Sequence, residues 1–139
     1  MEVNMSEHIQ ILTERFGKDS LMALATVDAE GMPWVRTIDA IFFGDSFYTI
    51  TYALSNKMKH IKENPRVAIS GEWFSGHAIG EDLGHIKLEK NQEIANRLRE
   101  AFASWYDNGH TNEDDPNTII LKIKLTDGTV FCNGKRIDF

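Results

Sequence analysis

The stretch SLMALATVDAEGMPWVRTIDAIFFGDSFYTITY, residues 20–52, contains three strand-like segments separated by short polar turns. The first segment is apolar on both alternating faces, as a strand buried on both sides would be, and the third is rich in aromatic and β-branched residues. We assign the three segments to Ser20–Val27, Pro33–Phe43 and Phe47–Tyr52. Three consecutive strands joined by short turns predict an antiparallel meander.

Helical and strand-like patterns share the rest of the chain. Apolar residues at helical spacing predict a helix with Met5, Ile9, Leu12 and Phe16 on one stripe and two more helices at Ser55–Asn64 and Glu89–Tyr106. Further strands are expected at 66–73, 77–86, 118–126 and 129–132, the last two separated by a turn at Asp127-Gly128. This order predicts a single mainly β domain with three α-helices that spans residues 1–139.

Composition narrows the classes of partner. The 139 residues suffice for one core, and the net charge of −6 disfavours nucleic acid and anionic membranes as partners. Apolar runs are far shorter than the ~20 residues that a membrane helix needs. Because Cys132 is the only cysteine and the N-terminus has no signal-like pattern, we expect no disulfide and a cytoplasmic protein.

A cluster of basic residues opens the second predicted helix. Residues 55–66 include Lys57, Lys59, Lys62 and Arg66 against Glu63 alone. Free N–H groups and the helix dipole favour an anion at a helix N-terminus, where Ser55 and Asn56 add hydrogen-bond donors beside Lys57. The pattern fits a phosphate site, but on this segment alone a capped surface helix with a solvated lysine face is the simpler interpretation.

Arg36 lies inside an otherwise apolar strand. A buried charge without a partner is costly, so this guanidinium requires one. A ligand phosphate is one candidate, and Asp39, Glu72 or a partner subunit are others. The alternating Thr49-Ile50-Thr51 fits a strand facing a polar ligand and also an ordinary half-exposed strand.

Four short motifs, in this order and at this spacing, resemble the FMN-binding split β-barrel family typified by pyridoxamine 5′-phosphate oxidase. They are GMPWVR at 31–36, FYT at 47–49, SNK at 55–57 and ENPRV at 63–67, and the resemblance covers residues 21–72. It implies a mainly β fold, a β-barrel with α-helices, and a homodimer with FMN at the interface.

The resemblance also implies the residues that bind the cofactor. Arg36, Ser55 and Lys57, with Asn56 between the last two, correspond to the phosphate site. The flavin ring and ribityl chain would contact Thr37, Ile38, Thr49, Ile50 and Thr51, and the second subunit would cover the rest. Backbone edges beside a flat heteroaromatic ring can orient it and tune its electronics.

This sequence departs from the oxidase pattern at several points. Ile41 stands where the oxidase has a lysine, and Asn56 stands where an arginine precedes the helix lysine. The last predicted strand is followed by no counterpart of the C-terminal segment that binds the substrate phosphate in the oxidase. We therefore expect an FMN-dependent oxidoreductase acting on an unidentified small molecule, with a nicotinamide nucleotide as a candidate electron donor, and not on pyridoxamine 5′-phosphate.

Other interpretations stay open. The protein could store or sense flavin without catalysis, or be a relative that uses a deazaflavin or haem. No catalytic acid or base is assigned. His77–His85 holds two histidines and two carboxylates, but their spacing matches no compact metal motif and we expect no metal. His77, Trp73 and Trp105 are candidates for contact with the flavin or are ordinary packed residues.

Overall fold

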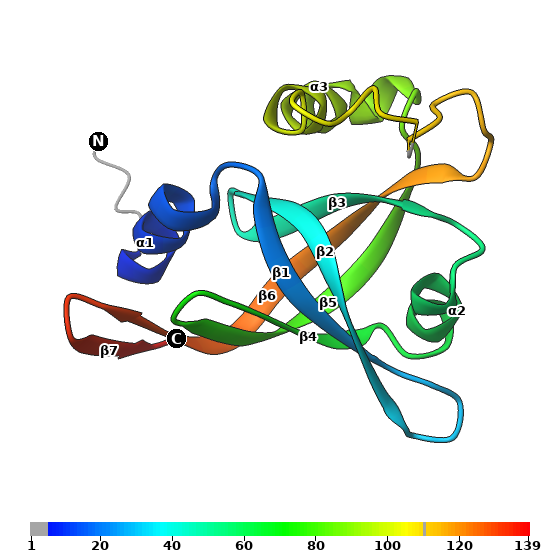
Figure 1. Cartoon of the computed structure of the whole chain (residues 1–139). Helices are drawn as coiled ribbons and strands as arrows, with labels where there is room; N and C mark the ends of the chain where they lie inside the picture. Colours follow the sequence, from blue (N-terminus) through cyan, green and yellow to red (C-terminus); the bar gives the residue numbers. More distant parts are fainter. Residues whose placement is uncertain (1–5, 110) are drawn as a thin grey trace.

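A computed structural model describes residues 6–109 and 111–139, so Met5 of the first predicted helix lies outside the described residues. The elements follow the order shown in Figure 1: α1 Glu7–Phe16, β1 Ser20–Val27, β2 Pro33–Phe43, β3 Ser46–Tyr52, α2 Asn56–Glu63, β4 Arg66–Gly71, β5 Phe74–His85, the 3₁₀ turn η1 Glu89–Asn91, α3 Gln92–Ala101, β6 Thr118–Cys132 and β7 Lys135–Asp138. None of the helices in this part of the chain is long and apolar enough to cross a membrane.

The strands form a closed antiparallel barrel. Their order is β3-β2-β1-β4-β5-β6, and pairing of β3 with β6 closes the ring, while β7 adds to the free end of β6. Closure removes the exposed edges that an open sheet would present. The first three strands pair in sequence, which confirms the predicted meander and the mainly β fold.

Two apolar clusters hold the barrel and its helices. The inner cluster fills the barrel and includes Leu24, Phe47, Ile69 and Phe74, all at most 4% exposed. The outer cluster packs α3 against the outside of the barrel and includes Ile41, Tyr48, Leu98, Phe102 and Ile120. Figure 1 shows α3 and the segment that follows it lying over one end of the barrel, beside β3. β3 therefore contributes to both clusters, through alternate side chains.

The structure corrects the predicted turn at Asp127-Gly128. β6 runs through this site without a turn because β5 pairs with it on both sides, and the irregularity is a bulge where His77 faces Asp127 and Ala78 faces Leu125. The C-terminal strand β7 is absent from the sequence-based expectations. It follows a turn at Asn133-Gly134, where both residues have positive φ, a typical hairpin signal.

The third predicted helix is shorter than its apolar pattern suggested. The prediction extended it to Tyr106, whereas α3 ends at Ala101 and turns follow from Phe102. The indole N–H of Trp105 donates to Asp19 Oδ2 at 2.8 Å. This contact ties the residues after α3 to the residue before β1, and Phe102, Trp105 and Tyr106 pack in the outer cluster without continuing the helix.

Candidate functional site

The site begins where β2 and β3 separate. The two strands pair only at Ile41–Tyr48, Phe42–Phe47 and Phe43–Ser46. Beyond these pairs β2 continues along β1 and β3 continues along β6. Residues 37–39 and 49–51 therefore face a gap in the ladder, bridged by the Thr49 hydroxyl, which donates to the Asp39 carbonyl at 2.6 Å.

A pocket of about 250 Å³ occupies this gap. Five of the nine residues expected from the sequence to bind cofactor line it, namely Thr37, Ile38, Thr49, Ile50 and Lys57. The remaining lining residues are Asp39, Phe102, Trp105 and Thr111. We call this the split-strand pocket. It has one wall of backbone and threonine from the barrel and one aromatic wall from the segment after α3.

Lys57 brings a cation to the split-strand pocket. Met58 and Ile61 anchor α2 in the inner cluster, which fixes Lys57 on the neighbouring face of the helix. Its ammonium donates to Thr51 Oγ1 at 2.6 Å and forms no ion pair with a carboxylate of the described residues. Burial lowers the pKa of Lys57, and repulsion from Arg36 lowers it further. Two cations thus lie close together, and neither has a carboxylate partner in the part of the chain that the structure describes.

Arg36 is held by neutral groups. Its guanidinium donates to Thr26 Oγ1 at 2.8 Å and to the Leu24 carbonyl at 3.2 Å. Thr26 is fully buried, and its Oγ1 lies 2.8 Å from His60 Nδ1, to which the single hydroxyl proton can be donated. Within the described part of the chain, Arg36 forms no ion pair with Asp39 or Glu72, the alternatives raised from sequence. Burial lowers the pKa of Arg36, as expected for a partly desolvated charge.

The first residues of α2 carry the other two expected phosphate ligands. Ser55 occupies the N-cap position, and its hydroxyl is buried without a hydrogen-bond partner among the described residues. A buried hydroxyl without a partner costs free energy until a ligand satisfies it. Asn56 is exposed and does not line the split-strand pocket. The helix start thus supplies free N–H groups and an unsatisfied hydroxyl beside Lys57.

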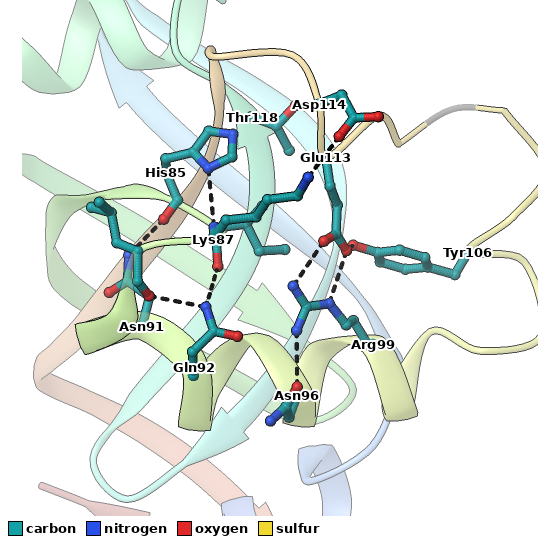
Figure 2. Close-up of polar contacts among 12 residues, drawn as sticks. His85, Lys87, Asn91, Gln92, Asn96, Arg99, Tyr106, Glu113, Asp114 and Thr118 are labelled. Atoms are coloured by element: carbon teal, nitrogen blue, oxygen red, sulfur yellow. Dashed lines mark hydrogen bonds and ion pairs between the residues drawn. The ribbon is translucent and has the colours of Figure 1, made fainter.

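The aromatic wall is fixed by a network between α3 and the segment that follows it. Arg99 binds Glu113 through two hydrogen bonds of 2.9 and 2.7 Å, and Tyr106 donates to the same carboxylate (Figure 2). Lys87 pairs with Asp114 at 2.6 Å in the same view. Hydrogen bonds from Arg99 and Tyr106 lower the pKa of Glu113 to about 2, while burial and Glu113 raise the pKa of Tyr106. These contacts tie the segment that carries Trp105 and Thr111 to α3.

Two carboxyl groups lie at the other end of the aromatic wall. Burial and the adjacent Asp19 carboxylate raise the pKa of Asp39 to about 6. From the sequence, Asp39 is expected only as a partner of Arg36, and Asp19, Phe102 and Thr111 are not expected at the site. These residues reach the site through contacts between segments that are far apart in the sequence, so no local motif predicts their position.

Several candidates from the sequence lie elsewhere. His77 pairs with Asp127 at 2.8 Å on an exposed part of β5, and His85 contacts the Asp115 carbonyl. Among the described residues, no three potential metal-ligating side chains converge. Trp73 is 68% exposed and does not line the split-strand pocket. Of the two tryptophans proposed to contact the flavin, only Trp105 reaches the pocket.

Comparison with known proteins places these features in a family. The model of the family described as "Pyridoxamine 5'-phosphate oxidase" matches residues 10–132 of this chain. No curated protein sequence matches this chain significantly. The family match includes every residue of the split-strand pocket.

Solved structures share the fold at low sequence identity. A heme binding protein from Mycobacterium smegmatis is 14% identical with a TM-score of 0.72, over 99% of this chain and 59% of its own length. General Stress Protein 26 from Bacillus anthracis is 15% identical with a TM-score of 0.71, over 96% and 100% of the two chains. A FAD-binding protein from Mesorhizobium loti is 14% identical with a TM-score of 0.68, over 89% and 92%. This chain therefore spans about three fifths of the mycobacterial protein and nearly all of the other two.

Proposed function

The chain belongs to the pyridoxamine 5′-phosphate oxidase family, and on that basis we propose that it binds FMN in the split-strand pocket and acts as an FMN-dependent oxidoreductase on a small molecule. The observation that carries the proposal is the pair of cations at Arg36 and Lys57, which have no carboxylate partner among the described residues. An anion at this position would neutralise both charges.

The phosphate of FMN fits the chemistry of the residues at the start of α2. Lys57 would bind it as a point charge, Arg36 would contribute positive potential, and the unsatisfied Ser55 hydroxyl would donate a hydrogen bond. The start of α2 adds free backbone N–H groups and the positive end of its dipole. All four contributions favour a dianionic group over a neutral one.

The polar gap between β2 and β3 fits the edge of a heteroaromatic ring. Thr37 and the backbone of residues 49–51 can orient such a ring, and Phe102 and Trp105 can pack on its apolar surface. The pocket volume of about 250 Å³ lies just below the ~300–1,000 Å³ usual for ligand sites. We therefore propose a homodimer in which a second protomer covers the remainder of the flavin.

The flavin would supply the electron-transfer chemistry, and the protein would supply binding, orientation and exclusion of water. Ile41, at the position of the lysine in the oxidase, is buried in the outer cluster and adds no charge to the site. This observation favours a second candidate function, namely a dimer that binds flavin without catalysis. Reduction of the bound flavin by a nicotinamide nucleotide would distinguish an oxidoreductase from a flavin store.

The first experiment is the visible absorption spectrum of the purified protein, with mass identification of any molecule that heat releases. Flavin bands with FMN in the released fraction are expected, and sedimentation of the loaded protein should give twice the 15.8 kDa of one chain. A Soret band would replace FMN by haem in the proposal. A colourless protein that ignores added FMN, or a loaded monomer, would contradict it.

A further inference from the structure

A hydrogen-bonded chain of three side chains links β2, β1 and α2. Arg36 Nη1 on β2 donates to Thr26 Oγ1 on β1 at 2.8 Å, and the same hydroxyl lies 2.8 Å from Nδ1 of His60 on α2. Thr26 is fully buried, so bulk water does not reach its hydroxyl. We call this set of contacts the Arg36 relay. Neither Thr26 nor His60 belongs to the sequence motifs or to the split-strand pocket.

The donors and acceptors of the Arg36 relay have one consistent arrangement. A guanidinium only donates, so Thr26 Oγ1 accepts from Arg36, and the hydroxyl has a single proton of its own to donate. His60 Nδ1 is the only acceptor for that proton among the described residues. His60 therefore takes part as the neutral ring with its proton on Nε2. Without this acceptor the buried hydroxyl would be unsatisfied, which costs free energy.

The structure holds Arg36 by one nitrogen of its guanidinium. Nη1 donates to Thr26 Oγ1, to the Leu24 carbonyl at 3.2 Å and to the Trp34 carbonyl at 3.5 Å. Nε and Nη2 have no acceptor in the part of the chain that the structure describes. The Nε–Nη2 edge of a guanidinium presents two parallel N–H groups, which match two oxygens of a phosphate. Arg36 is thus oriented while the edge that suits an anion stays unused.

Neutral partners suit this role better than a carboxylate would. Glu113 binds Arg99 through both of its oxygens, and that pair retains no net charge with which to attract a ligand. Thr26 and His60 instead orient Arg36 and leave its positive charge intact. An anion that reaches Arg36 therefore has no carboxylate of the described residues to displace.

The position of His60 is fixed from two sides. It follows Lys57 by three residues on α2, so the two side chains are neighbours on the helix surface and one turn of helix carries both the ammonium and the end of the Arg36 relay. The Trp34 ring lies against the His60 ring with centroids 6.1 Å apart, and the Trp34 indole donates to Asp28 at 2.9 Å. The relay therefore couples the orientation of Arg36 to the position of α2.

We propose that His60 and Thr26 are positioning residues, which orient the guanidinium of Arg36 so that its Nε–Nη2 edge binds the phosphate of FMN. This inference rests on the proposed function for the identity of the ligand, whereas the hydrogen bonds of the Arg36 relay do not depend on it. Loss of the relay should weaken binding of a ligand that carries a phosphate and spare binding of one that lacks it. Damage to the fold would weaken both.

The test is fluorescence titration of cofactor-free variants with FMN and with riboflavin. His60→Leu removes the acceptor of the relay, and Thr26→Val removes the hydroxyl at nearly the same volume. We expect each to weaken FMN binding about tenfold and riboflavin binding less than about twofold. His60→Asn keeps an acceptor one bond from Cγ, as Nδ1 is, and Thr26→Ser keeps the hydroxyl. Both conservative variants should bind FMN within about threefold of the original protein.

His77→Leu is the matched control for His60→Leu. It removes a histidine that is exposed on β5 and does not line the split-strand pocket, so it should leave both affinities unchanged. Equal losses of FMN and riboflavin affinity in His60→Leu would overturn the positioning role. Losses of FMN affinity in both conservative variants as large as those in His60→Leu and Thr26→Val would overturn it as well. In either case FMN binding by the original protein would leave the proposed function in place.

Titration of the cofactor-free protein with inorganic phosphate separates this inference from the proposed function in the other direction. We expect the original protein and the conservative variants to bind phosphate about equally, and His60→Leu to bind it about tenfold more weakly. If phosphate bound in this order while FMN did not bind, the proposed function would be overturned and the positioning role would stand. Failure of the original protein to bind either FMN or phosphate would overturn both.

Discussion

Two groups of charges on either side of the split-strand pocket are built differently. At the start of α2, Lys57 and Arg36 repel one another and are held by hydroxyl and carbonyl oxygens. Between α3 and the loop that precedes β6, Arg99 and Lys87 each face a carboxylate (Figure 2). Within the described residues, each cation of the second group has its counterion, and neither cation of the first group does.

This difference in counterions indicates where a ligand is required. A partly buried cation that lacks a counterion loses hydration without compensation, so folding gains little from it. The paired group of Arg99 and Lys87 fixes the segment that carries Trp105, and it needs nothing further. We therefore expect substitutions at the unpaired group to change ligand affinity, and substitutions at the paired group to change stability.

The largest effect is expected for Lys57→Met. Removing a charge-assisted contact of about 1.5–3 kcal/mol should weaken FMN binding roughly 10- to 150-fold, while riboflavin, which lacks the phosphate, should bind almost as before. The cofactor-free variant should be no less stable than the original protein, because the ammonium bonds to a hydroxyl and has no ion-pair partner among the described residues to lose. Fluorescence titration with both flavins and urea denaturation provide the two readouts.

Lys59→Met is the control for that variant. Lys59 is exposed on the same helix and does not line the pocket, so this substitution removes one charge without changing the pocket. Equal losses of FMN and riboflavin affinity in Lys57→Met, or an equal loss of FMN affinity in Lys59→Met, would show that the cation does not bind the phosphate.

The next effect concerns the paired group. Glu113→Gln should lower the free energy of unfolding by about 2 kcal/mol at neutral pH, because Arg99 and Tyr106 then share a neutral acceptor. The pKa of Glu113 is about 2 in the folded protein and near 4.5 when unfolded, so its contribution is complete above 4.5 and is lost as the pH falls toward 2. The difference between variant and original protein should shrink over the same range in denaturant titrations.

Glu93→Gln provides the comparison for Glu113. Glu93 lies 3.9 Å from Arg97 on α3 and its side chain is 75% exposed, against 21% for Glu113. We expect little change in stability from it. If Glu113→Gln were equally mild, the segment over the pocket would be held by packing of Phe102 and Trp105, and the polar network would be incidental.

Local signals carried much of the fold prediction. The meander at 20–52 and the short basic helix both follow from patterns within about ten residues, and the structure confirms them. The aromatic wall could not be found in this way. Trp105 there contacts Asp19, 86 residues away in the chain, and the helical periodicity of the sequence continues past Ala101, where the helix in the structure ends.

Prediction of the site from sequence was likewise limited to residues that lie close together in the chain. The five predicted residues that line the split-strand pocket lie on two strands and one helix that are close in sequence. Asp39 is expected only as a counterion, because sequence places it near Arg36 and cannot show that its side chain meets Asp19. The proximity of the two carboxyl groups follows from the register of β1 against β2, which places Asp39 opposite Leu21, two residues from Asp19.

The smallest effect is expected for Lys87→Met, although its ion pair, at 2.6 Å, is slightly shorter than the 2.7 Å pair of Arg99 with Glu113. The Lys87 and Asp114 side chains are 52% and 86% exposed. Water and salt therefore screen the attraction, and ordering two mobile side chains offsets what remains. We expect a denaturation midpoint close to that of the original protein, with any difference abolished in molar salt. A destabilisation as large as that of Glu113→Gln would mean that separation, and not burial, determines what an ion pair contributes in this protein, and the contrast between the two sides of the pocket would then need another explanation.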